Sequence, residues 1–253
     1  MAEILSKQYE SVFSWPKNET YQLTRRTNIS IKDIDLCTED FEQVMLEMDV
    51  GSAPGPDGIP ALLYKTYAKE LSWPIKEIWR RSLDTGKMPE GPILANITPI
   101  YKSDDKSDPS NYRPISLTNH LTKIFERVLR KHLVEHLESQ DLMNNSQHGF
   151  RERRSTITQL LSFYDSVLSM MEEGHFVHAI YLDFAKAFDK VDHTILLAKV
   201  EALGIDGKLL SWIKSFLTTR YQRVKIGDHA SEPVKVRSGV PQGSVLGPFL
   251  FII

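Results

Sequence analysis

The sequence predicts an α+β fold built from helices and antiparallel hairpins, and three observations support this class. Apolar residues recur at the three-four spacing of a helix in 38–48, 120–140 and 209–220. Short runs rich in β-branched and aromatic residues, bounded by polar turns, occur at 95–102, 111–118 and 221–227. Helices come first, then a hairpin, then more helices, then strands and helices mixed. This order favours α+β over a regularly alternating fold.

Composition excludes several classes of protein. The 253 residues are 41% hydrophobic and 25% charged, which is typical of a globular chain with a substantial core. With 33 acidic and 31 basic residues the net charge is -2, so a site for a polyanion has to be local. We interpret the single cysteine, Cys37, as a small apolar residue before a helix, and it excludes an internal disulfide.

Targeting and membrane signals are missing from the pattern. No stretch approaches the roughly 20 apolar residues of a membrane span, and the first ten residues lack the plan of a signal peptide. We therefore expect no membrane partner, no secretion, and an intracellular location in the nucleus, the cytoplasm or both.

The N-terminal half is predicted to be mostly helical. Residues 1–35 show no sustained period, so we expect an extended lead-in or linker. Thr38 can cap a helix over 38–48, which the three prolines and two glycines of 52–60 stop. Two short helices follow at 59–71 and 74–83, and Gly86 caps the second.

The middle of the chain predicts a hairpin followed by two helices. Strands at 95–102 and 111–118 are joined by the polar loop 103–110. The clearest helix covers 120–140, with one buried apolar stripe and basic residues on its other faces. Ser155 can cap a further helix that runs to Met171 and is closed by Gly174.

The C-terminal part begins with a predicted strand over 175–184 that is buried on both faces. Helices are expected at 191–204 and 209–220, a hairpin at 221–227 and 233–239, and a sharp turn into an apolar segment at 239–253. Asp183 stands near the end of the buried strand, where a carboxylate is costly unless it is compensated. From the residues alone it is either a capping or ion-paired residue or a metal ligand, whereas Asp189 and Asp192 fit helix capping better.

The stretch 238–248, SGVPQGSVLGP, places three glycines and two prolines between a strand and an apolar helix. Its backbone can approach another molecule closely, and the amide of Gln242 could point at a ligand. A tight turn explains one glycine and one proline more readily than it explains Gln242, although PQG alone is a weak signal.

Five segments together resemble the reverse transcriptases of non-LTR (LINE-type) retrotransposons. YLDFAKAFDKVDH resembles motif A and SGVPQGSVLGPFLF resembles motif B of that family. APGPDGIP, ITPIYKSDDKSDPSNYRPISLTN and QHGFRERRST precede them in the family's order. The resemblance implies a right-hand polymerase with fingers at 36–175 and a partial palm with motifs A and B at 176–253.

The same resemblance implies an RNA-directed DNA polymerase that transfers nucleotides to a primer 3′-hydroxyl by two-metal chemistry. The implied partners are an RNA template, a DNA primer and deoxynucleoside triphosphates, and the implied cofactor is Mg²⁺, which prefers hard oxygen ligands. Asp183 matches the catalytic aspartate that holds the metals, with the backbone carbonyl of Phe184 as a further ligand.

Four residues match nucleotide-binding positions of the family. Phe188 matches the aromatic gate that packs under the sugar and excludes a 2′-hydroxyl, and Gln242 matches the glutamine beside the incoming nucleotide. Lys102 and Arg113 match basic residues that grip the triphosphate. Without the resemblance, Phe188 would be assigned to the core and both cations to the solvated surface of a hairpin.

Arg151, Arg153 and Arg154 form a local basic cluster that suits the template or primer backbone. The alternative is that they solvate the entrance of a helix, and the resemblance of the neighbouring residues favours the nucleic-acid role.

The resemblance implies a motif C, an Ala-Asp-Asp hairpin, after motif B, and we interpret the sequence as truncated within motif B because it ends at Ile253. We therefore expect the motif C hairpin and the thumb to be absent and this chain to be inactive as it stands. The alternative function is a catalytically dead remnant that acts at most as a nucleic-acid-binding module.

Overall fold

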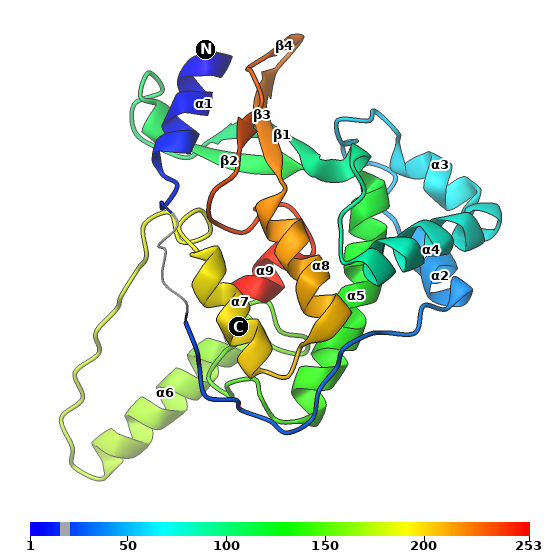
Figure 1. Ribbon diagram of the computed structural model, residues 1–253. Coiled ribbons are helices and arrows are strands. Elements are labelled where there is room, and N and C mark those ends of the chain that lie inside the picture. Colours follow the sequence, from blue (N-terminus) through cyan, green and yellow to red (C-terminus); the bar gives the residue numbers. More distant parts are fainter. Residues whose placement is uncertain (16–20) are drawn as a thin grey trace.

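The computed structural model describes residues 1–15 and 21–253, and the part of the predicted lead-in at 16–20 lies outside this range. The described chain forms one mixed sheet flanked by helices, which is the predicted α+β class (Figure 1).

The helices of the N-terminal half follow the predicted order, but the boundary between the last two differs from the prediction. They are α2 (Thr38–Leu46), α3 (Ala61–Thr66) and α4 (Ala68–Thr85), and Gly86 closes α4 with a φ of 64°. The boundary between α3 and α4 falls at Tyr67, and α4 continues through Pro74, whereas the predicted boundary lay near this proline. Ile75, Trp79 and Leu83 bury one face of α4, so tertiary packing stabilises the helix across the position where the proline lacks an N–H donor.

The lead-in differs from the expectation of an extended segment. Residues 2–11 form helix α1 (Ala2–Ser11), which lies against β3. Leu5 and Tyr9 are one turn apart and are buried against Ile97 and Val224 of the sheet. This tertiary contact, rather than a long helical period, fixes the helix.

The sheet joins the predicted hairpin to the C-terminal part. β1 (Leu94–Tyr101) pairs antiparallel with β2 (Tyr112–Leu117), as predicted, and parallel with β3 (Tyr221–Ile226). β3 pairs in turn with β4 (His229–Ala230) and β5 (Val234–Lys235), so the expected second strand at 233–239 is shorter.

The remaining predicted helices form close to their expected bounds. They are α5 (His120–Ser139), α6 (Thr156–Glu172), α7 (His193–Ala202), α8 (Gly207–Thr218) and α9 (Leu246–Phe251). Ser155 makes the predicted cap of α6 as part of a capping box with Thr158. Asp192 caps α7 by accepting from the N–H groups of Thr194 and Ile195.

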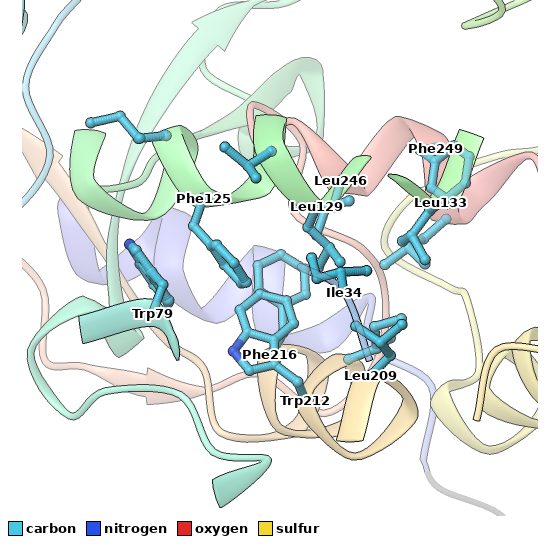
Figure 2. Packing of buried hydrophobic residues seen from close by; sticks show 14 of the residues in the cluster. Ile34, Trp79, Phe125, Leu129, Leu133, Leu209, Trp212, Phe216, Leu246 and Phe249 are labelled. Carbon is cyan, nitrogen blue, oxygen red and sulfur yellow. The ribbon is translucent and has the colours of Figure 1, made fainter. Parts of the chain in front are cut away.

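The core is centred on α5. The ring of Phe125 stacks on Trp79 of α4 with centroids 4.5 Å apart and meets Trp212 of α8 edge-on at 5.0 Å. Figure 2 shows these rings near Leu129, with Leu133, which is also buried, one turn further along α5. The core therefore runs without a break from the predicted fingers into the predicted palm.

The predicted buried strand at 175–184 is wrong. This segment is extended but forms no strand, and it runs back from α6 along the outside of the molecule (Figure 1). Phe176 is 97% exposed, and Ile180, Tyr181 and Leu182 are each more than 80% exposed. A strand needs a neighbour for its backbone hydrogen bonds, and none of the described strands pairs with this segment.

Replacing the central ring tests the core. We expect Phe125→Ala to lower the free energy of unfolding by about 3–5 kcal/mol, because it removes a fully buried ring between two tryptophans. Urea denaturation followed by tryptophan fluorescence measures this. The matched control is Phe176→Ala, an exposed phenylalanine, for which we expect a change within about 0.5 kcal/mol. Equal losses for the two variants would contradict this assignment of the core.

Candidate nucleotide-binding cleft

An open cleft of about 480 Å³ lies between the end of the β1–β2 hairpin and the turn that follows 175–184. Its volume is in the range of sites for small ligands. Six residues singled out in the sequence line it: Lys102, Arg113, Asp183, Phe184, Phe188 and Gln242. The fold thus brings together residues as far apart in sequence as 102 and 242.

The hairpin forms the basic wall of the cleft. Lys102 follows β1 and its N–H donates to the carbonyl of Asn111 at 2.9 Å, while Arg113 lies in β2 opposite Ile100. Both side chains are exposed, and neither has a carboxylate within ion-pair distance in the described part of the chain. Their charges are therefore available to an anionic ligand.

The loop 103–110 uses its own carboxylates to order its backbone. Asp105 accepts from the N–H of Ser107 and Asp108 accepts from the N–H of Ser110, each at 2.8 Å. The bond from Ser107 lowers the pKa of Asp105. These acids stabilise the loop instead of neutralising the two cations beside it.

The opposite wall is the turn at 183–189. Asp183 and Phe184 are exposed at the end of the unpaired segment. The turn that follows contains Lys186, with a φ of 54°, whose ammonium donates to the carbonyl of Ser110 at 3.3 Å. This bond links the turn to the hairpin loop across the cleft.

Phe188 belongs to both the core and the cleft. Its half-buried ring stacks on Phe251 of α9 with centroids 4.6 Å apart and meets Phe150 edge-on at 6.0 Å. Phe188 also lines the cleft, so one residue can pack against the core and face a ligand.

Gln242 is held in place by the backbone on either side of it. Its carbonyl accepts from the N–H of Ser116 in β2 at 2.7 Å. A Cβ on Gly243 would lie 2.5 Å from the carbonyl oxygen of Ser116, and its φ is 118°, so glycine is required there. Nearby, the N–H of Val240 donates to the carbonyl of Phe188 at 2.8 Å. The loop therefore touches both walls of the cleft.

Glu126 is a residue that the sequence reasoning missed. It lies on the buried face of α5, and its Oε2 accepts from the N–H groups of Val245 and Leu246, both at 2.8 Å, where α9 begins. Burial raises the pKa of Glu126 to about 7, although the two backbone bonds act in the opposite direction. An acid at the three-four spacing of Leu129 and Leu133 was a signal that could have revealed it.

Asp189 differs from the predicted capping role. It does not cap α7 but lines the cleft, half-buried, and burial raises its pKa. Burial also lowers the pKa of Arg220, to about 10, and the Arg220 guanidinium donates to the carbonyl of Gly239 at 2.8 Å. The burial of Asp189 and of Arg220 results from the fold, and no local pattern in the sequence predicts it.

The three predicted template-binding arginines lie outside the cleft. The Nη2 of Arg151 donates to both carboxylate oxygens of Glu138 at 2.9 Å, and only 9% of the Arg151 side chain is exposed. Arg154 donates to the carbonyl of Asn145 at 3.1 Å. Arg153 is exposed, with a φ of 57°. Arg151 and Arg154 thus stabilise their own loop, and Arg153 keeps its side chain in solvent.

Carboxylate ligands for a metal do not converge in the described residues. The cleft wall contains Asp104, Asp183 and Asp189, all hard oxygen donors of the kind that Mg²⁺ prefers. No group of three His, Cys, Asp or Glu side chains in 1–15 and 21–253 is arranged to hold an ion. The donor chemistry fits Mg²⁺, but the geometry does not form a complete site.

Comparison with known proteins identifies the class. Residues 100–253 match the family described as reverse transcriptase (RNA-dependent DNA polymerase), which is more than half of the chain. The chain belongs to this family, whose members are RNA-directed DNA polymerases. It lies among the reverse transcriptase domains of non-LTR retrotransposons, as the resemblance predicted.

Individual relatives come from insect mobile elements. The chain is 28% identical over 249 residues to the probable RNA-directed DNA polymerase from transposon BS of Drosophila melanogaster, covering 95% of this chain and 27% of that protein. It is 31% identical over 216 residues to the RNA-directed DNA polymerase from mobile element jockey of the same species, covering 85% and 24%. It is 28% identical over 201 residues to the Pol polyprotein of element R2 from Popillia japonica, covering 79% and 27%. The chain thus spans about a quarter of the length of these relatives.

Within 1–15 and 21–253, no helix combines the length and apolar character that crossing a bilayer requires.

The buried carboxylate should make stability depend on pH. An acid whose pKa is raised on folding binds its proton more tightly in the native state, so stability falls as the pH rises from about 4.5 through about 7. Glu126→Gln keeps an oxygen acceptor for both N–H groups and removes this titration. We expect its free energy of unfolding to rise relative to wild type by roughly 3 kcal/mol between pH 4.5 and pH 8.

Urea denaturation at several pH values measures this difference. Glu201→Gln, at an exposed position on α7, is the control and should show no such trend. A difference between Glu126→Gln and wild type that stays constant with pH would contradict the burial of an ionisable carboxylate at this point.

Proposed function

We propose that this chain carries the nucleotide-binding part of an RNA-directed DNA polymerase that copies an RNA template onto a DNA primer. The observation that supports this most strongly is the single cleft lined by Lys102, Arg113, Phe188 and Gln242, in a chain of the reverse transcriptase family. Template, primer and deoxynucleoside triphosphates are the proposed partners.

Each wall of the cleft suits one part of the nucleotide. The exposed cations Lys102 and Arg113 provide charge for the triphosphate, and Arg113 can make bidentate contacts with phosphate oxygens. Phe188, whose ring stacks on Phe251, is the apolar floor that we assign to the sugar and the residue that would exclude a 2′-hydroxyl. The side chain of Gln242 can hydrogen-bond the nucleotide, because its backbone is held by Ser116.

Asp183 and the backbone carbonyl of Phe184 are the residues we propose to hold Mg²⁺. When bound, the metal would stabilise charge on the attacking and leaving oxygens of nucleotidyl transfer. In the described residues Asp183 is exposed and is not joined by two further carboxylates. We therefore propose that this 253-residue polypeptide is by itself inactive in polymerisation, and that binding is the activity it retains.

The two cations of the cleft give the first test of this function. We expect Lys102→Ala and Arg113→Ala each to weaken binding of a fluorescent dATP analogue about tenfold or more, because a hydrogen bond to a charged group contributes about 1.5–3 kcal/mol. Fluorescence titration measures the Kd. Lys225→Ala, an exposed lysine on β3 outside the cleft, should bind like wild type. Unchanged binding in both cleft variants would sink the proposed nucleotide site.

Primer extension tests the catalytic part of the proposal. On an RNA template with a DNA primer, deoxynucleotides and Mg²⁺, we expect no incorporation above that of Asp183→Ala, because the metal ligands do not converge. Gel analysis of labelled primer measures this. Robust extension that Asp183→Ala abolishes would disprove the inactivity of this polypeptide while supporting its role as a polymerase.

A further inference from the structure

Three basic side chains follow one another on the first turns of α5. His120, Lys123 and Arg127 are three and four residues apart, so they share one side of the helix. The first turn of α5 contains no acidic residue, and cations near a helix N-terminus are unfavourable because the helix dipole is positive there. A cluster of this kind is stabilised when a negative charge lies beside it.

A cavity of about 110 Å³ opens beside this cluster. It lies between the end of α2, residues 49–52 and α5, and His120, Lys123 and Arg127 all line it. It is separate from the nucleotide cleft, with which it shares no lining residue.

His120 brings a buried ring to the wall of this cavity. The residue is 1% exposed, and its ring meets Tyr64 edge-on at 6.3 Å. Its Nε2 is buried and has no hydrogen-bond partner among the described residues, which is unfavourable for a polar atom. Burial, with a contribution from the charge of Lys123, lowers the pKa of His120 and so favours the neutral ring, which can donate one N–H.

Lys123 and Arg127 lack carboxylate partners within ion-pair distance in the described chain. Two other cations of the same helix do have such partners: Arg130 pairs with Glu152 at 3.1 Å and Lys131 pairs with Asp40 at 2.9 Å. Lys123 is half-buried, and burial lowers its pKa. Covering an unpaired ammonium is unfavourable unless an anion approaches it.

The acidic group of the cavity wall does not cancel these charges. Asp49 lines the cavity, and its Oδ1 accepts from the N–H of Gly51 at 2.9 Å. Two cations against one acid leave the site positive, which favours an anion over a metal cation as its ligand.

We propose that this cavity is a binding site for a phosphate group, held by the charges of Lys123 and Arg127 beside the ring of His120. The phosphate can belong to a nucleic-acid strand or be free in solution. A strand as its source rests on the proposed function: only Thr118 and Asn119 separate α5 from β2, whose Arg113 lines the nucleotide cleft. The site thus follows Arg113 of the cleft closely along one continuous segment, at the N-terminal turns of α5.

Two binding measurements on the 253-residue chain test this site, without primer or nucleotide. The first titrates inorganic phosphate and follows the imidazole nitrogens of His120 by NMR. The second titrates a labelled single-stranded RNA and follows fluorescence anisotropy at several salt concentrations. We expect Lys123→Met and Arg127→Gln each to weaken RNA binding several-fold and to reduce the slope of log K against log salt by about 0.7, the value for one phosphate contact on a single strand.

Two further variants separate charge from structure. Lys123→Arg should restore binding, because it keeps the charge that Lys123→Met removes. Lys214→Met removes an exposed lysine of α8 and should leave both the RNA affinity and the salt slope as in wild type. Melting temperatures equal to that of wild type confirm that the variants are folded.

The outcomes identify the source of the phosphate or overturn the site. Loss of RNA affinity and of salt slope supports a strand phosphate. A phosphate-dependent change at His120 that Lys123→Met abolishes, with RNA binding unaltered, supports free phosphate. No change in either titration overturns the proposal. Because neither titration contains a deoxynucleotide, failure here is distinct from failure of the nucleotide cleft, which Lys102→Ala and Arg113→Ala report.

Discussion

The carboxylate of Glu126 and the backbone N–H groups of Val245 and Leu246 form the contact on which the cleft depends. Glu126 follows Phe125, whose ring packs between Trp79 of α4 and Trp212 of α8 in the core. The carboxylate therefore joins the buried core to the loop that carries Gln242. A neutral acceptor would cost less to bury, whereas an ionised carboxylate binds two N–H groups more strongly. A pKa raised to about 7 indicates that the cost of burying the charge outweighs the contribution of the two N–H bonds.

Most helices could be predicted because their signals are local. Period, caps and breakers are carried by neighbouring residues, as the capping box at Ser155 and the left-handed Gly86 show. Where the structure differs from the prediction, a contact between segments far apart in the sequence determines the local structure. Helix α1 forms against the sheet through Leu5 and Tyr9, and α4 continues through Pro74 because its buried face packs on the core. The parallel pairing of β1 with β3 joins segments more than a hundred residues apart, which no local pattern encodes.

Site residues were predictable only as far as the family resemblance identified them. Lys102, Arg113, Phe188 and Gln242 are individually ordinary residues, and their convergence is a property of the fold. Glu126 and His120 were missed and Asp189 was assigned to helix capping, because burial, rather than residue type, makes these groups unusual. Conversely, Arg151 and Arg154 were predicted to be available to nucleic acid, but Arg151 forms an ion pair with Glu138 and Arg154 donates to the carbonyl of Asn145. Charge counted along a chain thus overestimates charge available to a ligand, since ion pairs form between segments that only the fold brings together.

The two walls of the cleft are stabilised by different means, and this difference bears on catalysis. The hairpin and the Gln242 loop are fixed by backbone hydrogen bonds to each other and by Glu126. Asp183 ends a segment whose apolar side chains are exposed and whose backbone pairs with no described strand. High β propensity cannot order such a segment alone, because its N–H and C=O groups need partners from a neighbouring strand. The residues of the proposed nucleotide site are therefore held in place within the described chain, whereas precise placement of Asp183, the proposed metal ligand, requires a strand beside it. A neighbouring strand would give the 175–184 segment partners for its backbone and hold Asp183 in a fixed position, so that completion of the proposed metal site would be coupled to completion of the sheet.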